Sequence, residues 1–229
     1  MLKRSVEKIQ NRQPLRIALY GDSISEVDRT PGYFGGASSF EMNWGQQLKR
    51  LLQKEYPGQE FIIQHFGAGG HNTYEALGRL DYLLPLKPDL VLIELGANDC
   101  GWHELSPAQS GVALERMIEC LEFQLKCDIV ILGVAGDNPA ERLMKHHAET
   151  FAAQKQVAEK HQFPFVDLLS ASARATKNGE RWAEYHNGRQ DCHPNDKGHV
   201  VWADAVFEVL KRHLPLAGRF LVLGGCATR

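Results

Sequence analysis

The chain has 229 residues, a formal net charge of −2 at pH 7 and a near-neutral pI, which excludes the basic surface of a nucleic-acid-binding protein and gives no attraction to an anionic membrane. Its five cysteines are odd in number and form no CxxC pair, so neither a disulfide framework nor a zinc site is indicated, and we expect reduced thiols and a cytoplasmic location. No stretch is apolar enough to span a bilayer, and charged residues interrupt the N-terminal segment where a signal peptide would be apolar.

After the first 14 residues, which we expect to form a lead-in, short apolar runs alternate with longer amphipathic segments. The apolar runs predict buried strands at Leu15–Tyr20, Phe61–Phe66, Leu90–Leu95, Ile129–Val134 and Phe163–Val166. The amphipathic segments predict helices at Asn43–Tyr56, Thr73–Leu84, Pro107–Lys126, Pro139–His161 and Lys197–Leu214. This alternation predicts a flavodoxin-like three-layer α/β/α sandwich with a mostly parallel five-stranded sheet. We expect one domain over residues 15–213, followed by a tail, residues 214–229, of unassigned role.

Polar and glycine-rich blocks directly follow the first three predicted strands. Gly21–Ser23 follows the first strand, Gly67–Thr73 the second and Gly96–Asp99 the third. In a parallel α/β sheet the carboxyl ends of the strands share one edge, where ligands bind. His193 precedes the last predicted helix, whose packing can return it to that edge. Serine needs an imidazole to take its proton and donors to hold the oxyanion, so these blocks predict a nucleophilic serine site.

Two aromatic segments could form walls of such a site. The loop between Ser25 and Asn43 is rich in glycine and contains Tyr33, Phe34 and Phe40. It is long enough to act as a pocket wall or lid, or as an Ω-loop that only covers the edge. The second segment, Ser172–Asn187, contains Trp182 and Tyr185. Aromatic side chains suit both a sugar face and an acyl chain, so they leave the substrate open.

The four blocks, GDSI, GAGG, GAND and HPND, resemble those of the SGNH (GDSL) hydrolase superfamily over about Leu15 to His213. The resemblance implies that Ser23 is the nucleophile and His193 the general base. It also implies an oxyanion hole made by the backbone N–H of Ser23 with Gly70 and Asn98, and no cofactor or metal ion. Four further residues near the same edge are expected to line the pocket: Asp22, His71, Asp99 and Gln190.

The last block departs from the family pattern, which places an aspartate three residues before the histidine. Here that position is Gln190, and the aspartate is Asp191, two residues before His193. Three arrangements are open: Asp191 reaches His193 Nδ1, the Gln190 carbonyl oxygen does so, or a backbone carbonyl leaves a Ser–His dyad. We expect the first, because a carboxylate also stabilises the charged imidazole.

The resemblance implies a serine esterase that cleaves carboxylic esters through an acyl-serine intermediate. Since no long apolar stripe suggests an acyl tunnel, we expect a small acyl group, such as O-acetyl on a carbohydrate. Lysophospholipase and thioesterase activities are alternatives within the same fold. The expected partner is a small-molecule or carbohydrate ester rather than nucleic acid or a spanned membrane, and the oligomeric state is open.

Three alternatives come from other classes. A metal-dependent phosphoesterase could draw its ligands from Asp22, Asn98, Asp99, His193 and His199. A nucleotide-binding module is weakly supported, because GAGG follows the second strand and is not GxGxxG. A catalytically inactive scaffold of the same fold is the third.

Overall fold

The structure, a computed structural model, describes residues 2–100, 105–133, 146–175, 182–187, 191 and 193–215. Within these residues one five-stranded sheet has the order β2-β1-β3-β4-β5, and every pairing is parallel. The strands are β1 (Leu15–Gly21), β2 (Phe61–Gly67), β3 (Leu90–Glu94), β4 (Asp128–Gly133) and β5 (Phe165–Asp167). The predicted sheet is thus confirmed, with strand ends shifted by one or two residues.

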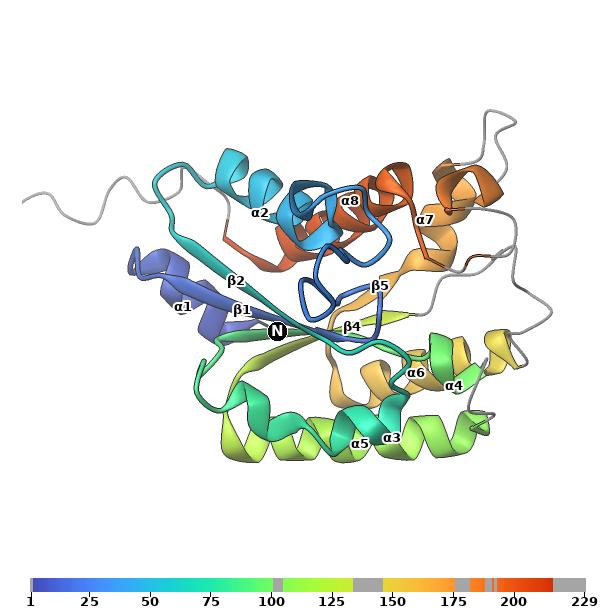
Figure 1. Cartoon of the computed structure of the whole chain (residues 1–229). Helices are drawn as coiled ribbons and strands as arrows, with labels where there is room; N and C mark the ends of the chain where they lie inside the picture. Colours follow the sequence, from blue (N-terminus) through green and yellow to red (C-terminus); the bar gives the residue numbers. More distant parts are fainter. Residues whose placement is uncertain are drawn as a thin grey trace, which may run out of the picture.

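Helices cover both faces of this sheet (Figure 1). One face carries α2 (Trp44–Glu55), α7 (Leu168–Ala175) and α8 (Asp196–His213), and the other carries α3 (Thr73–Leu77), α5 (Pro107–Gln124) and α6 (His147–His161). The central strands β1 and β3 are buried along nearly all of their length because both of their faces pack against helices. Two apolar cores result, one on each face of the sheet. This is the expected three-layer α/β/α architecture.

Side-chain caps begin several of these helices where the sequence has a suitable polar residue. Asn43 caps α2 by accepting a hydrogen bond from the Gly45 N–H at 2.9 Å. Asn72 and Glu75 form a capping box at α3, and Ser106 forms one at α5 with Pro107 as the first helical residue. The caps therefore fix the residues at which α2 and α3 begin.

The observed helices differ from the predicted ones in four places. The N-terminal lead-in contains a helix, α1 (Lys3–Gln10), whose flanking Leu2 and own Ile9 join a core. The predicted Thr73–Leu84 helix is divided into α3 and a 3₁₀ turn, η2 (Leu80–Leu83), because α3 ends at Gly78. The short helices α4 (Ala97–Cys100) and α7 were not predicted; their four and eight residues are too few for a helical period to be distinctive.

Two further 3₁₀ turns, η1 (Phe40–Met42) and η5 (Trp182–Tyr185), lie in the two predicted aromatic segments. The start of the predicted Pro139–His161 helix and the tail from residue 216 onward lie outside the described residues. No helix in the described ranges combines the length and the apolar character that crossing a bilayer requires.

Candidate active site

The Gly21–Ser23 block forms a tight turn at the carboxyl end of β1. Asp22 Oδ1 accepts a hydrogen bond from the Ile24 N–H at 3.0 Å, which bends the chain just past Ser23. The end of β2 packs against this turn at Gly67, where an added Cβ would lie 2.1 Å from the Glu26 nitrogen. Only glycine allows this approach, so the second block supports the serine turn directly.

A network of hydrogen bonds holds the loop that carries His193 in front of α8. The Asn187 N–H donates to the His193 carbonyl at 3.1 Å, and the Asn195 N–H donates to the Tyr185 carbonyl at 2.9 Å. Asn195 also caps α8 by accepting from the Lys197 N–H at 3.0 Å. These hydrogen bonds therefore fix the position of the loop relative to α8, as the sequence predicts.

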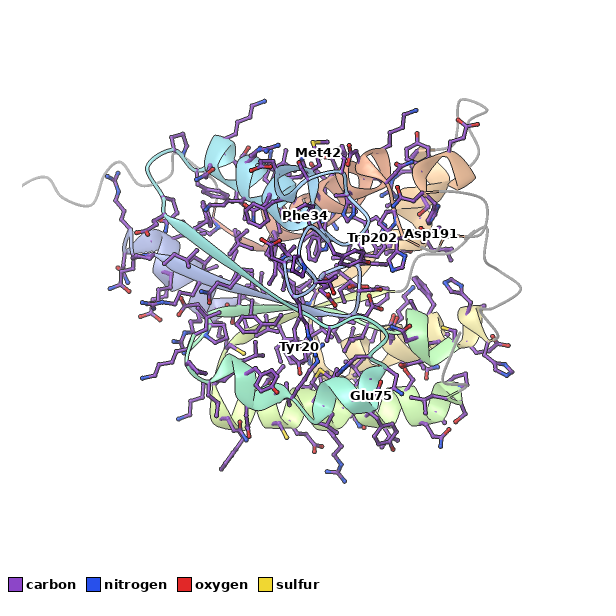
Figure 2. All side chains as sticks on the ribbon, in the orientation of Figure 1. Tyr20, Phe34, Met42, Glu75, Asp191 and Trp202 are labelled. Atoms are coloured by element: carbon purple, nitrogen blue, oxygen red, sulfur yellow. The ribbon has the colours of Figure 1, made fainter. Side chains whose placement is uncertain are left out.

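Ser23, His193 and Asp191 form a continuous hydrogen-bonded chain. His193 Nε2 lies 2.8 Å from Ser23 Oγ, and His193 Nδ1 lies 2.6 Å from Asp191 Oδ1. Asp191 lies on the side of the molecule where the strands end (Figure 2). This arrangement can pass the serine proton to Nε2 while the carboxylate holds the other ring nitrogen as a donor.

The Asp191 carboxylate is charged at neutral pH. Partial burial by itself would raise its pKa, but hydrogen bonds from the His193 N–H and ring lower the pKa overall. Its side chain is 43% exposed, so solvent weakens its interaction with the imidazole compared with a buried pair. Gln190, the alternative partner in the sequence, lies outside the described residues.

Gly70 and Asn98 lie in the turns that follow β2 and β3. Gly70 has φ +77°, a left-handed conformation that the turn into α3 requires and that glycine adopts without strain. Asn98 Nδ2 donates to the His71 carbonyl at 3.0 Å and, weakly, to Asp22 Oδ2 at 3.4 Å. These bonds fix the orientation of the Asn98 amide; the residue as a whole is 7% exposed.

Beneath the serine turn, two buried acidic side chains lie close together at the ends of β1 and β3. Burial raises the pKa of Asp22 to about 6, against a lowering by the Ile24 N–H. Burial and the neighbouring Asp22 raise the pKa of Glu94 well above its ordinary value. Glu94 Oε2 also accepts a hydrogen bond from Ser25 Oγ at 2.8 Å. The pair supports the nucleophile turn from below.

Two of the expected pocket residues, Asp99 and Asp22, are buried and hydrogen-bonded in the structure. Asp99 is fully buried and accepts hydrogen bonds from the Thr73 N–H and hydroxyl and from the Ser110 hydroxyl. It therefore ties α3 and α5 to α4. Asp22 is only 1% exposed and acts inside the turn. His71 is partly exposed, and its carbonyl orients Asn98.

The residues that could supply ligands in the alternative metal-dependent phosphoesterase do not form a metal site in the described part of the chain. Both ring nitrogens of His199 make hydrogen bonds inside the protein, with the Trp44 N–H at 3.1 Å and the Gly35 carbonyl at 3.1 Å. Burial lowers the pKa of His199 to about 4, so the ring is neutral. Asp99 is occupied as described above. Nowhere in the described ranges do three His, Cys, Asp or Glu side chains meet as metal ligands.

Two residues near Ser23, Glu26 and Tyr33, make contacts within the site that the sequence did not indicate. Glu26 is buried and accepts a hydrogen bond from the Gly69 N–H, next to Gly70. Nothing in the sequence separates this glutamate from an exposed loop residue. Tyr33, expected only as part of an aromatic loop, has its ring edge against the His193 ring at a centroid distance of 6.0 Å.

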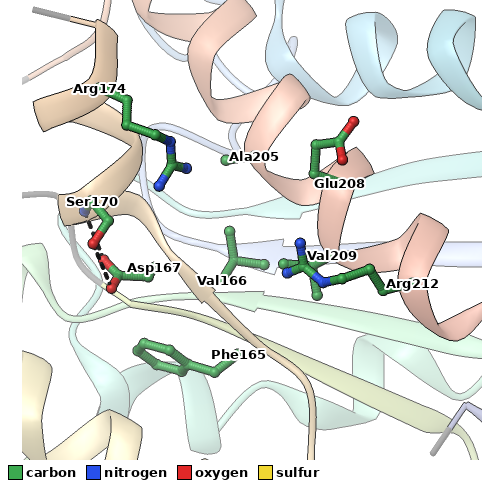
Figure 3. A pocket seen from close by; sticks show the side chains of 9 residues that line it. All are labelled: Phe165, Val166, Asp167, Ser170, Arg174, Ala205, Glu208, Val209 and Arg212. Carbon is green, nitrogen blue, oxygen red and sulfur yellow. Dashed lines mark hydrogen bonds between the residues drawn. The ribbon is translucent and has the colours of Figure 1, made fainter. Parts of the chain in front are cut away.

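A cavity of about 420 Å³ lies elsewhere, between β5, α7 and α8. Figure 3 shows Arg174 and Arg212 on either side of it, with Asp167 bonded to Ser170. None of the residues lining the cavity belongs to the cluster around Ser23. Both arginines are exposed, and Asp167 and Glu208 balance their charge.

Several solved structures share this architecture at about one-fifth sequence identity. An acetylxylan esterase from Geobacillus stearothermophilus matches with a TM-score of 0.71 and 20% identity, covering 86% of this chain and 94% of its own. A lipase/acylhydrolase from Enterococcus faecalis matches with a TM-score of 0.68 and 21% identity, covering 88% and 98%. A two-domain esterase active on acetylated mannans matches with a TM-score of 0.70 and 20% identity, covering 92% of this chain and 52% of its own.

No curated protein matches the chain. The model of the GDSL-like lipase/acylhydrolase family matches residues 19–201, which contain all four sequence blocks. This match spans most of the chain, from the end of β1 into α8. The chain therefore belongs to the GDSL-like lipase/acylhydrolase family of serine hydrolases.

Proposed function

We propose that this protein hydrolyses carboxylic esters of small acyl groups through an acyl-serine intermediate, with O-acetyl groups on carbohydrate as the first substrate class to test. The observation that carries the proposal is the chain from Ser23 Oγ to His193 Nε2, at 2.8 Å, and from His193 Nδ1 to Asp191 Oδ1, at 2.6 Å. The structural neighbours that act on acetylated xylan and mannan support the choice of substrate.

In the first half of the proposed reaction, Ser23 Oγ attacks the ester carbonyl carbon while its proton moves to His193 Nε2. The carbonyl oxygen becomes an oxyanion, which the Ser23 N–H, the Gly70 N–H and the Asn98 amide would hold. The intermediate then collapses, and His193 returns the proton to the departing alcohol oxygen. An acyl-Ser23 ester and a free alcohol result.

In the second half, water takes the place of the alcohol. His193 removes a proton from the water as its oxygen attacks the acyl carbon, and it returns that proton to Ser23 Oγ when the carboxylic acid leaves. Asp191 keeps Nδ1 of the imidazole protonated and stabilises the charged ring in both halves. The site residues need no metal ion for these steps.

The experiment that tests the proposal measures hydrolysis of p-nitrophenyl acetate, butyrate and octanoate by the wild-type protein and Ser23→Ala, each with and without EDTA. Acetylated xylo- and manno-oligosaccharides follow as substrates. We expect turnover that EDTA does not change, that Ser23→Ala lowers by on the order of 10⁴-fold or more, and that falls from acetate to octanoate.

The other outcomes point to the alternative functions. A rate that increases with chain length would favour a lysophospholipase or thioesterase. Activity that survives Ser23→Ala and is lost with EDTA would contradict the mechanism and favour a metal-dependent phosphoesterase. Absence of turnover on every ester would favour a binding scaffold.

A further inference from the structure

The side chain of Tyr33 combines a partly exposed ring with a buried hydroxyl. The hydroxyl oxygen forms no hydrogen bond of normal geometry with any group that the structure describes. Leaving a buried hydroxyl without a good hydrogen bond costs free energy. A buried hydroxyl that forms no well-aligned hydrogen bond inside a reactive site is therefore a candidate for contact with a substrate.

The Tyr33 hydroxyl lies near the side chain of Ser23, and the Tyr33 ring lies against the imidazole of His193. The Ser23 side chain interacts with the Tyr33 hydroxyl and lowers its pKa, but burial raises that pKa by more. The hydroxyl is therefore protonated and neutral at physiological pH and can only act as a hydrogen-bond donor or acceptor. The ring stands edge-on to the imidazole of His193 at a centroid distance of 6.0 Å.

The loop that presents Tyr33 is tied to the site on both sides. Asn43 Nδ2 donates to the Phe34 carbonyl at 3.0 Å, and the adjacent Gly35 carbonyl is bonded to His199 Nε2 at 3.1 Å. Asn187 Nδ2 donates to the Gly36 carbonyl at 2.7 Å, which links the loop to the segment before His193. Because the Asn187 N–H also donates to the His193 carbonyl, Asn187 connects the loop of Tyr33 with the segment that carries His193.

The position of the Tyr33 hydroxyl determines which atom of the substrate it would contact. In the proposed reaction the oxyanion points to the turns after β2 and β3, which carry Gly70 and Asn98. The alcohol oxygen must lie next to His193 Nε2, because that atom returns the proton to it. Tyr33 packs on His193 and interacts with Ser23, and these two contacts favour the alcohol oxygen over the oxyanion as the atom that its hydroxyl would meet.

We propose that Tyr33 is a further catalytic residue, whose hydroxyl donates a hydrogen bond to the alcohol oxygen of the ester as that oxygen leaves. This inference rests on the proposed function. No proton is transferred by Tyr33: His193 supplies the proton that the alcohol takes up, and the tyrosine stabilises the partial negative charge that develops before the proton arrives. Its contribution is therefore greatest for alcohols that leave poorly.

The test compares wild-type protein and Tyr33→Phe on a series of acetate esters, from p-nitrophenyl through other aryl acetates to alkyl acetates. The phenyl ring is retained and only a hydroxyl without a well-aligned hydrogen bond is lost, so we expect the variant to fold with an unchanged or slightly raised Tm. For alkyl acetates we expect kcat/KM to fall about tenfold. For p-nitrophenyl acetate, whose anion leaves without help, we expect a fall of less than about threefold.

Ser23→Ala and Tyr56→Phe are measured on the same esters as Tyr33→Phe. Tyr56 is also a buried tyrosine, but it packs on Phe61, away from the site, so its variant should keep the wild-type dependence on the leaving group. An equal fall on all esters in Tyr33→Phe would overturn the inference and leave Tyr33 as a residue that only positions Ser23. No fall on any ester would also overturn it while leaving the proposed function intact. Activity that persisted in Ser23→Ala would overturn both.

Discussion

At the scale of single residues, Asp191 binds His193 twice through one oxygen. Asp191 Oδ1 accepts hydrogen bonds from the His193 N–H at 2.9 Å and from Nδ1 at 2.6 Å. The backbone bond turns the chain back on itself over two residues, as in an Asx turn. That turn explains how an aspartate two residues before the histidine reaches the ring, although the family pattern has it three residues before.

We expect Asp191→Asn to lower kcat on p-nitrophenyl acetate by on the order of 10² to 10⁴, because an amide can hold the ring in the wrong tautomer and does not stabilise the imidazolium. The lower part of this range reflects the 43% exposure of the side chain. Steady-state kinetics with a Tm measurement checks this. Gln190→Ala is the control and should retain activity within about threefold. Comparable losses in both variants would remove Asp191 from the proposed triad.

At the scale of elements, the ends of β1 and β3 bring two acidic side chains together under the nucleophile turn. Asp22 and Glu94 are both buried, which raises the pKa of each, and the nearby Asp22 makes it still harder for Glu94 to ionise. Both therefore bind a proton more tightly in the folded state than in the unfolded state. The contribution of Asp22 to stability is fully present below its ordinary pKa of 3.8 and is lost as the pH rises through its folded pKa of about 6. The contribution of Glu94 is lost in the same direction, as the pH rises through its own raised pKa.

Glu94→Gln should therefore raise the free energy of unfolding at pH 8 by about 1 kcal/mol or more. The amide oxygen can still accept the Ser25 hydroxyl, and the repulsion with Asp22 is removed. At pH 4, where both acids are largely protonated in the folded protein, the gain should be smaller. Urea unfolding at the two pH values measures this, with Glu122→Gln on the exposed face of α5 as the control. A variant that is less stable at pH 8 would show that the glutamate charge is needed.

The elements that carry the site could largely be predicted, because each has a local pattern. The apolar runs of β1, β2 and β3 placed the three turns at one edge, and the apolar face of α8 placed His193 there. Helix α1 could not be predicted as part of the domain, because its Leu2 and Ile9 find apolar partners only in the folded core. The roles of Asp99 and Glu26 could not be predicted either, because the groups that donate hydrogen bonds to them belong to other elements.

At the scale of the whole molecule, α1 is held at the end of the sheet opposite Ser23. Asp128, the first residue of β4, accepts from the Ser5 N–H at 2.6 Å and from the Ser5 hydroxyl at 2.7 Å. Asp89, just before β3, accepts from Arg4 Nε at 2.7 Å and from the Arg16 N–H at 3.0 Å. The two carboxylates join the N-terminus of the chain to β1, β3 and β4.

We expect Asp128→Ala to lower the free energy of unfolding by about 2 kcal/mol, because it leaves the donors at the start of α1 without their acceptor. Since α1 lies far from Ser23, kcat on p-nitrophenyl acetate should stay within about twofold of wild type. Chemical unfolding and steady-state kinetics check the two parts. Asp81→Ala, at an exposed position of η2, is the matched control and should change stability by less than about 0.5 kcal/mol. A loss of activity without a loss of stability would contradict a purely structural role.

By itself the sequence determined the alternation of strands and helices, the shared edge of the polar blocks and the family to which the chain belongs. These follow from apolar periodicity and short motifs, which depend on neighbouring residues alone. Only the tertiary structure decided that Asp191 meets His193 Nδ1, that Asp22 and Glu94 share a buried site, and that Tyr33 lies beside Ser23. Such contacts depend on how distant segments pack: Ser23 and His193 are 170 positions apart, and no local pattern encodes the 2.8 Å between them.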